Sequence, residues 1–225
     1  MIEQNIKIVQ SKIAEACSIS GRKIDDVKFV AVSKTKPNSD IYSAIRAGLN
    51  DFGENKALEF KEKAESIENN VVWHFIGHLQ TNKVKYVVPY AEFIHSVESE
   101  KLAVEINKRA KKINKIQKIL LEFNTSNEDS KFGLRSFEEG LRLAEFCMQQ
   151  PNLLLAGLMT MAPFTNDESI IHKSFAKLKN IFDKLNARDF NLSHLSMGMS
   201  NDYQIAIEEG STMVRVGSAI FGARN

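Results

Sequence analysis

The residue with the clearest chemical potential is Lys34, at the end of the run 28–34. Apolar and β-branched residues dominate this run, and Pro37 ends it, which predicts a buried strand. Period-two alternation puts Val30, Val32 and Lys34 on one face of that strand. A lysine partly removed from water has a lowered pKa, because burial disfavours the charged amine. A neutral amine suits Schiff-base chemistry, although a solvated lysine just past a strand end explains this run alone more simply.

Arg215 is a second residue that needs a chemical explanation. It lies inside the apolar run 213–216 and shares the parity of Met213 and Gly217. A guanidinium within a buried strand is costly unless something accepts its hydrogen bonds. A nearby carboxylate or a bound ligand could supply the acceptors, and the sequence leaves both open.

Two turns that contain glycine and serine could bind an anion. Gly198 and Ser200 lie in the segment 196–202, where the glycine allows close backbone approach and the serine is a good N-cap. Gly217 and Ser218 follow the run 213–216 and can begin a short helical turn whose amides point the same way. Ordinary capping explains each turn singly, but two such turns at successive strand ends make an anion site equally plausible.

The elements that would position these residues alternate between strand and helix. Alternation of this kind indicates a parallel sheet with helices outside it. After an opening helix over 2–18, strands are predicted at 29–33, 51–53, 71–76, 93–96, 119–123, 153–159, 194–196 and 213–216. Helices are predicted between them at 39–47, 56–67, 81–87, 98–111, 137–148, 168–185 and 202–208, with only a short turn after the last strand.

Eight strands in a chain of 225 residues suggest a single (β/α)8 barrel domain over 1–225. A doubly wound open sheet is the alternative. In a barrel of this kind, function resides at the C-terminal ends of the strands. Lys34 would then lie at the end of the first strand, and the two turns at the ends of the seventh and eighth.

Composition bounds the class of protein. The chain is 43% hydrophobic and 26% charged, as in ordinary soluble proteins. Its net charge of +2 does not indicate nucleic-acid binding, which is typical of strongly basic domains. No apolar stretch is long enough to cross a membrane, and the N-terminus lacks the features of a signal peptide, so we expect a cytoplasmic protein. Cys17 and Cys147 lie far apart in helical segments and are expected to be small buried residues.

A lysine that can be neutral, a pair of anion-binding turns and a buried arginine together suit pyridoxal 5′-phosphate (PLP). The aldehyde of PLP would form a Schiff base with Lys34. Its phosphate would lie on the amides near Ser200, Gly217 and Ser218. Arg215 would face the pyridine nitrogen.

The sequence resembles the YggS/PROSC family of PLP homeostasis proteins, which are similar to the barrel domain of bacterial alanine racemase. The resemblance is carried by AVSKTKP (31–37), FGEN (52–55), WHFIGHLQTNK (73–83), GLMTM (157–161), LSMGMSND (195–202) and GSTMVRVG (210–217). These segments run in order over nearly the whole chain. The resemblance implies a covalent PLP on Lys34 and a pocket lined by Asn55. It also implies a phosphate site at Ser200, Gly217 and Ser218, with Arg215 as the partner of the pyridine nitrogen.

One loop departs from the family pattern, since Phe132 stands after Lys131 where the family has a small residue. Lys131 is either a second lysine near the pocket mouth or, more simply, a solvated loop lysine; the role of Lys36 stays open.

The histidines suggest no metal, because His74 and His78 straddle a strand and a loop and no third ligand is placed. His78 could line the pocket, and His95 is expected to be a hydrogen-bonded strand residue. His172 is expected on a helix surface, and His194 begins a strand.

The choice between an enzyme and a binding protein depends on Arg215. The electron sink of PLP is strongest when its pyridine nitrogen is protonated, usually beside a carboxylate. An arginine cannot give up its proton and would hold that nitrogen unprotonated. Racemases of the resembling fold tolerate this, but a second domain supplies a base on the opposite face of the cofactor. This chain ends at Asn225, soon after the eighth predicted strand.

We therefore expect a PLP-binding protein that buffers PLP or delivers it to PLP-dependent apo-enzymes, and that is a monomer. One alternative is an amino acid racemase or another PLP enzyme that uses a residue of the barrel itself. Another is a class I aldolase in which Lys34 attacks a sugar phosphate directly.

Overall fold

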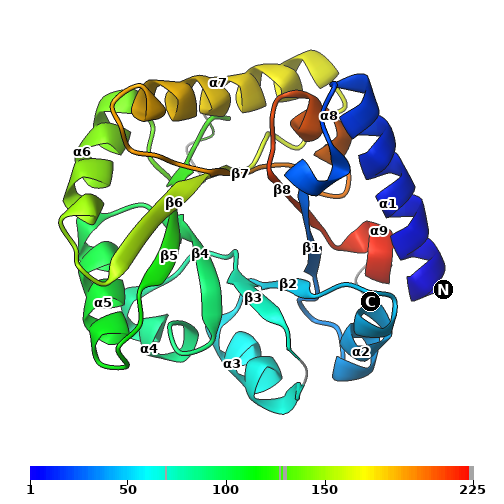
Figure 1. The fold of residues 1–225 in the computed structure, drawn as a ribbon, viewed down its shortest axis with the longest axis horizontal. Coiled ribbons are helices and arrows are strands. Elements are labelled where there is room, and N and C mark those ends of the chain that lie inside the picture. Colours follow the sequence, from blue (N-terminus) through cyan, green and yellow to red (C-terminus); the bar gives the residue numbers. More distant parts are fainter. Residues whose placement is uncertain (69, 127, 129–130, 223–225) are drawn as a thin grey trace.

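The computed structural model describes residues 1–68, 70–126, 128 and 131–222, and eight parallel strands in this part of the chain close into a barrel (Figure 1). The strands are β1 (Lys28–Val32), β2 (Asp51–Glu54), β3 (Val72–Phe75), β4 (Ala91–Val97), β5 (Gln117–Phe123), β6 (Leu153–Thr160), β7 (His194–Ser196) and β8 (Met213–Val216). β1 pairs with both β2 and β8, so the sheet has no open edge. The predicted barrel is confirmed, and the doubly wound open sheet is wrong.

Helices surround the barrel in a ring (Figure 1). They are α1 (Ile2–Ile19), α2 (Asn38–Arg46), α3 (Ala57–Ser66), α4 (Val84–Val87), α5 (Glu100–Lys111), α6 (Phe137–Met148), α7 (Glu168–Asn186), α8 (Tyr203–Glu208) and α9 (Ser218–Phe221), with 3-10 turns at Ile24–Asp26 and Thr81–Lys83. The helix expected over 81–87 is therefore a 3-10 turn followed by the short α4. The helix expected from 98 begins at Glu100, because the Ser99 hydroxyl accepts a hydrogen bond from the Leu102 amide and caps it.

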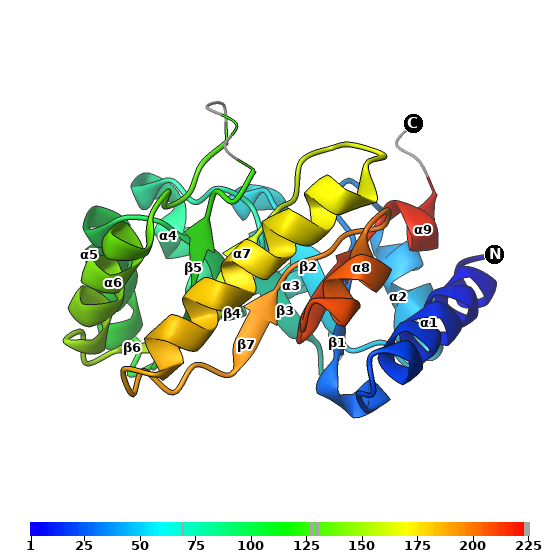
Figure 2. The same cartoon turned by 90° about the horizontal axis from the view of Figure 1, so that it is seen from above.

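The N-terminal helix α1 fills the place in the ring between α8 and α2 (Figure 1). Its buried face carries Ile6, Val9 and Ile13, at the three- and four-residue spacing of an amphipathic helix. Burying each such side chain stabilises the fold by about 1.5–3 kcal/mol. α1 also contacts the single turn of α9, and the two lie side by side in both views (Figure 2). The start of the chain thus covers the region where β8 meets β1.

The barrel interior differs from the larger core between sheet and helices. A small apolar cluster fills part of the interior, and its buried members are Phe93, Leu120, Ala156, Met159 and Met213. Strand alternation places polar side chains among them, including the buried His74 and His95. The interior is therefore partly polar, which requires hydrogen-bond partners for each buried group.

Several smaller expectations concern residues away from the barrel interior. Cys17 and Cys147 are both free and buried, as predicted. Within the described ranges, no helix is long and apolar enough to cross a membrane. Arg224 and Asn225 lie outside the described residues. The organisation as one domain over 1–225 stays a prediction.

Candidate functional site

A cavity of about 580 Å³ opens at the C-terminal ends of the strands, and we call it the strand-end cavity. All of the residues predicted to bind a cofactor line it, together with residues that end or follow β5 and β6. The predicted residues are Lys34, Asn55, Ser200, Arg215, Gly217 and Ser218. Closure of the barrel brings them together, because β1 and β8 are far apart in sequence but neighbours in the sheet.

Lys34 lies in the tight turn that follows β1. The strand ends at Val32, slightly earlier than predicted, and Lys34 is half-buried in the turn. Val32 and Lys34 both line the strand-end cavity, as the predicted alternation requires. Thr35 has a left-handed backbone with φ 64°, a conformation that residues other than glycine adopt only under local constraint. The turn that presents Lys34 is therefore held by contacts outside it.

Those contacts come from a group of charges that we call the Lys63 cluster: the buried Lys63 and Glu54, and the half-buried Glu59. Lys63 Nζ donates to the carbonyl of Ser33 at 2.7 Å, to Glu54 Oε1 at 2.8 Å and to Glu59 Oε1 at 2.7 Å. Glu59 Oε1 also accepts the amide of Thr35. Both neighbours of Lys34 in the chain are thus tied to α3, and the sequence analysis did not identify this cluster.

The two predicted anion-binding turns meet at Ser200. Its Oγ lies 3.2 Å from the amide nitrogen of Gly217 and 3.4 Å from that of Ala219, and it accepts from both. Gly198 has φ 93°, and a Cβ at this position would lie 2.5 Å from Cβ of Ala206 in α8. Only glycine therefore lets the turn after β7 fold so closely onto α8. The convergence of the two turns makes a compact polar corner in the strand-end cavity.

Arg215 lies in the floor of the strand-end cavity with 3% of its surface exposed. Its Nη1 donates to Ser196 Oγ, and its Nη2 donates to the carbonyl of Thr160 at 2.9 Å. Among the described residues these acceptors are a hydroxyl and a backbone carbonyl, so a carboxylate ion pair, one of the two possibilities that the sequence left open, is not found. Burial lowers the pKa of Arg215 to about 10, against the opposing charges of Asp202 and Glu122. The guanidinium thus keeps its charge at neutral pH and has further N–H donors for a ligand.

Two polar atoms in the wall of the strand-end cavity are buried without a hydrogen-bond partner among the described residues: Asn55 Oδ1 and Glu122 Oε2. Glu122 is only 4% exposed. Burial raises its pKa to about 7, with a further contribution from Glu98 and against the charge of Arg215. The sequence analysis missed Glu122, although it is a single charged residue inside the apolar run 119–123, the same signal that marked Arg215.

Lys131 does not line the strand-end cavity. Its Nζ donates to the carbonyl of Ala162 at 3.1 Å and lies 2.6 Å from Glu128 Oε2. Lys131 therefore lies next to the cavity, because Ala162 lines it, and it joins the loops after β5 and β6. Lys36 does line the cavity, and its Nζ donates to the carbonyl of Phe221 at the end of α9.

The histidines lie where the sequence placed them. His78 lines the strand-end cavity and stacks on Phe132, with ring centroids 3.8 Å apart. His172 lies on α7 and contacts Glu209 at 2.7 Å. His95 is a fully buried, hydrogen-bonded strand residue. Within the described part of the chain, no three His, Cys, Asp or Glu side chains converge as metal ligands would.

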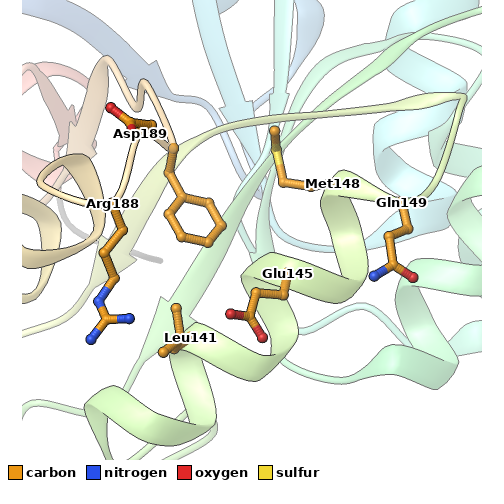
Figure 3. Close-up of a pocket in the computed structure, with 7 residues that line it drawn as sticks. Leu141, Glu145, Met148, Gln149, Arg188 and Asp189 are labelled. Atoms are coloured by element: carbon orange, nitrogen blue, oxygen red, sulfur yellow. The ribbon is translucent and has the colours of Figure 1, made fainter.

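A second hollow, of about 510 Å³, lies between α6 and the turn after α7 (Figure 3). Its lining includes Leu141, Glu145 and Met148 of α6, and Arg188 from that turn. None of the predicted cofactor residues lines this hollow. The strand-end cavity is therefore the candidate functional site.

The chain matches the family "Alanine racemase, N-terminal domain" over residues 2–225. It is 41% identical to the pyridoxal phosphate homeostasis protein of Aquifex aeolicus, over 98% of this chain and 97% of that protein. It is 36% identical to the protein of the same name from Escherichia coli, over 100% of this chain and 97% of that protein.

Solved structures agree with these relatives. A structure of PipY from Synechococcus elongatus with PLP bound is 31% identical, with a TM-score of 0.80, over 93% of this chain and 100% of that one. The alanine racemase of Clostridium difficile shares the fold, with a TM-score of 0.78 at 15% identity over 98% of this chain and 57% of that one. The resemblance drawn from the sequence is confirmed: this chain belongs to the alanine racemase N-terminal domain family and, within it, to the pyridoxal phosphate homeostasis proteins.

Proposed function

We propose that this chain binds PLP in the strand-end cavity and acts in PLP homeostasis, by holding the cofactor and passing it on. The observation that carries the proposal is the convergence of Lys34, Arg215 and the Ser200 corner in one cavity. The names of its relatives and the PLP in the PipY structure support the same ligand.

The residues present fit PLP on chemical grounds. The Ser200 corner joins a hydroxyl to the amides of Gly217 and Ala219, groups suited to a phosphate. The buried Asn55 Oδ1 and the remaining donors of Arg215 are polar groups of the kind that an aromatic ring with polar substituents can satisfy. PLP supplies an aldehyde that reacts reversibly with a primary amine, and we assign that amine to Lys34.

The residues of the chain favour holding over catalysis. Arg215 stays charged and donates hydrogen bonds, so it would leave the pyridine nitrogen without a proton and the electron sink weak. The Lys63 cluster fixes the turn that carries Lys34, which keeps the amine in place as the ligand enters and leaves.

One observation favours the alternative, a PLP enzyme that uses a residue of the barrel itself. Glu122 is a buried carboxyl group in the cavity wall, and its pKa of about 7 suits proton transfer near neutral pH. Incubation of the PLP-loaded protein with L-alanine and L-serine separates the two functions. The homeostasis proposal expects essentially no D-isomer, whereas steady turnover that Glu122→Gln abolishes would establish the enzyme instead.

The site of attachment is tested by borohydride reduction of the PLP-loaded protein, followed by peptide mapping. We expect the pyridoxyl group on Lys34 and loss of the Schiff-base absorption band in Lys34→Ala. Lys36→Ala is the matched control, since Lys36 lines the same cavity two residues away. A pyridoxyl group found chiefly on Lys36 or Lys131 would contradict the assignment, and a colourless protein that takes up no PLP would favour the aldolase alternative.

We further propose that this protein is a cytoplasmic monomer and that PLP-dependent apo-enzymes receive the cofactor from it. The free Cys17 and Cys147 suit a reducing compartment. Mixing the PLP-loaded protein with an apo-enzyme tests delivery: activity should appear faster than with the same concentration of free PLP.

A further inference from the structure

The barrel interior contains an unbroken series of hydrogen bonds that we call the central polar chain: Asp51, His74, His95, Ser196 and Arg215. His74 Nε2 lies 2.9 Å from Asp51 Oδ1, and His74 Nδ1 lies 2.9 Å from His95 Nε2. His95 Nδ1 lies 2.9 Å from Ser196 Oγ, which accepts from Arg215 Nη1. The side chains of the middle three residues are inaccessible to water.

The central polar chain connects the two ends of the barrel. Asp51 is the first residue of β2 and pairs with Lys28, the first residue of β1, at 3.0 Å. Arg215, at the other end, lines the strand-end cavity. The contact between His95 of β4 and Ser196 of β7 crosses the interior, because these strands are not neighbours in the sheet (Figure 1).

The charge states of the residues in the central polar chain determine which atom donates in each of its hydrogen bonds. Burial opposes the charge of Asp51, but His74 and Lys28 outweigh it and lower the pKa of this carboxyl, so it is an acceptor. Burial lowers the pKa of His74 and holds that of His95 well below its ordinary value, so both rings are neutral. A neutral imidazole has one donor and one acceptor nitrogen.

Only one direction of donation then satisfies every contact. His74 must donate from Nε2 to Asp51, which leaves its Nδ1 to accept from His95 Nε2. His95 Nδ1 must therefore accept the hydroxyl proton of Ser196, whose oxygen accepts from Arg215. Every proton points toward Asp51, and bonds aligned in this way strengthen one another.

We propose that Asp51, His74, His95 and Ser196 are positioning residues for Arg215, and that the central polar chain holds its guanidinium in the floor of the strand-end cavity. Ser196 Oγ is a fixed acceptor because its own proton is committed to His95. Arg215 Nη2 is held by the Thr160 carbonyl. The guanidinium is thereby fixed at two nitrogens beside the strand-end cavity that it lines, and its remaining donors are available to a ligand. That the ligand is PLP rests on the proposed function. The central polar chain does not depend on it, because its hydrogen bonds are present in the protein without ligand.

The first test uses the ligand-free protein labelled with ¹⁵N in histidine and arginine. We expect His74 and His95 both to carry their proton on Nε2, and the Nη signals of Arg215 to be resolved because rotation of the guanidinium is restricted. A proton on Nδ1 of either ring would reverse the direction of donation in the central polar chain, and a charged ring would interrupt it. Either result would overturn the proposal.

The second test changes Asp51, the member of the central polar chain that is farthest from the strand-end cavity. Asp51→Leu removes the final acceptor of the central polar chain. Glu92→Gln is the matched control, because Glu92 is a carboxylate of β4 whose charge also acts on His74 but whose ion pair is with Lys118, so this change breaks no hydrogen bond of the central polar chain. In Asp51→Leu we expect broadened Arg215 Nη signals and an affinity for PLP that falls by roughly three- to tenfold. With PLP labelled with ¹⁵N in its ring, the pyridine signal should move toward that of a nitrogen without a hydrogen bond. Glu92→Gln should change none of these.

Ser196→Ala keeps the proposal testable if Asp51→Leu does not fold, since it removes one atom next to Arg215. Its effects on the Arg215 signals and on affinity should equal or exceed those of Asp51→Leu. Unchanged Arg215 signals in the folded variants would overturn the proposal. If the wild type bound no PLP, the proposed function would fail, while the histidine tautomers and the Arg215 signals would still decide whether the chain positions Arg215.

Discussion

Glu122 is a buried acid whose protonation affects stability as well as the ligand site. Its pKa is raised from an ordinary value of 4.5 to about 7, chiefly by burial. Between pH 4.5 and about pH 7, Glu122 is therefore protonated in the folded state but ionised in the unfolded state. The free energy of unfolding falls as the pH rises through this range. The full penalty, reached above pH 7, is on the order of 3 kcal/mol at about 1.4 kcal/mol per pKa unit.

Glu122→Gln should remove this penalty. We expect the ligand-free variant to be more stable than the wild type at pH 8 by up to about 3 kcal/mol, and to differ little at pH 4.5. Urea unfolding at the two pH values measures the difference. Glu92→Gln is the control: hydrogen bonding to Lys118 lowers the pKa of Glu92, so its removal should not stabilise the protein at pH 8. An equal gain in stability at both pH values would contradict the assignment.

Ser200 tests the phosphate site at the scale of one hydroxyl. Ser200→Ala removes a donor from the corner where the amides of Gly217 and Ala219 converge. Losing a hydrogen bond to a charged group should weaken PLP by roughly ten- to a hundredfold, and pyridoxal, which lacks the phosphate, far less. Ser218→Ala is the matched control, because it keeps the backbone amide. Titrations with both ligands decide the matter, and equal weakening of both would move the anion site elsewhere.

Single residues could be predicted from the sequence where a local pattern marks them. Lys34 ends an apolar run and Gly217 follows one, so both were placed at strand ends and both line the strand-end cavity. His95 and Ser196 contact each other across 101 positions of the sequence, and only barrel closure brings them together. No local pattern could reveal such contacts.

At the scale of elements, the strand boundaries are predicted chiefly from the ends of apolar runs in the sequence. The bounds of β7 and β8 agree with the prediction, whereas β4 and β5 each begin two residues earlier than expected. Glu92 and Lys118 lie in these early segments and pair across the two strands at 2.5 Å. A charged residue at a strand start resembles loop sequence until its partner on the next strand is known.

The turn between β1 and α2 depends on α3 for its shape, through the Lys63 cluster. Lys63→Met would leave Glu54 buried without its cation, because Glu54 is inaccessible to water. Breaking a buried ion pair in this way costs about 3–5 kcal/mol. We expect that loss in urea unfolding, and faster hydrogen exchange at the Thr35 amide, which donates to Glu59.

Two further variants show whether the Lys63 effect is specific. Lys61→Met, on the same helix, removes a half-exposed pair with Glu65 and should cost less than about 1 kcal/mol. Adding Glu54→Gln to Lys63→Met should recover part of the loss, since the buried charge is then gone. A Lys63→Met variant no less stable than Lys61→Met would show that the cluster does not hold the turn.

At the scale of the whole molecule, the N-terminal segment secures the last strand-helix unit. Asn5 Nδ2 donates to the carbonyl of Ile220 in α9 at 2.8 Å. Arg22 Nη1 donates to the carbonyls of Ile207 and Ser211 at 2.9 and 2.7 Å, at the end of α8 and just beyond it. Alternation in the sequence predicted a barrel but could not show that α1 completes its ring, because that depends on contacts between the two ends of the chain.

These two contacts should separate global stability from ligand binding. Asn5→Leu and Arg22→Met each remove hydrogen bonds between the ends of the chain and should each cost about 1–3 kcal/mol of stability. Of these two side chains, Asn5 is the one with a described hydrogen bond to α9, whose Ala219 amide reaches Ser200. Asn5→Leu should therefore weaken PLP severalfold while Arg22→Met leaves affinity unchanged, as measured by titration alongside thermal unfolding. If both variants lost affinity in proportion to their loss of stability, α1 would support the barrel as a whole and not the Ser200 corner.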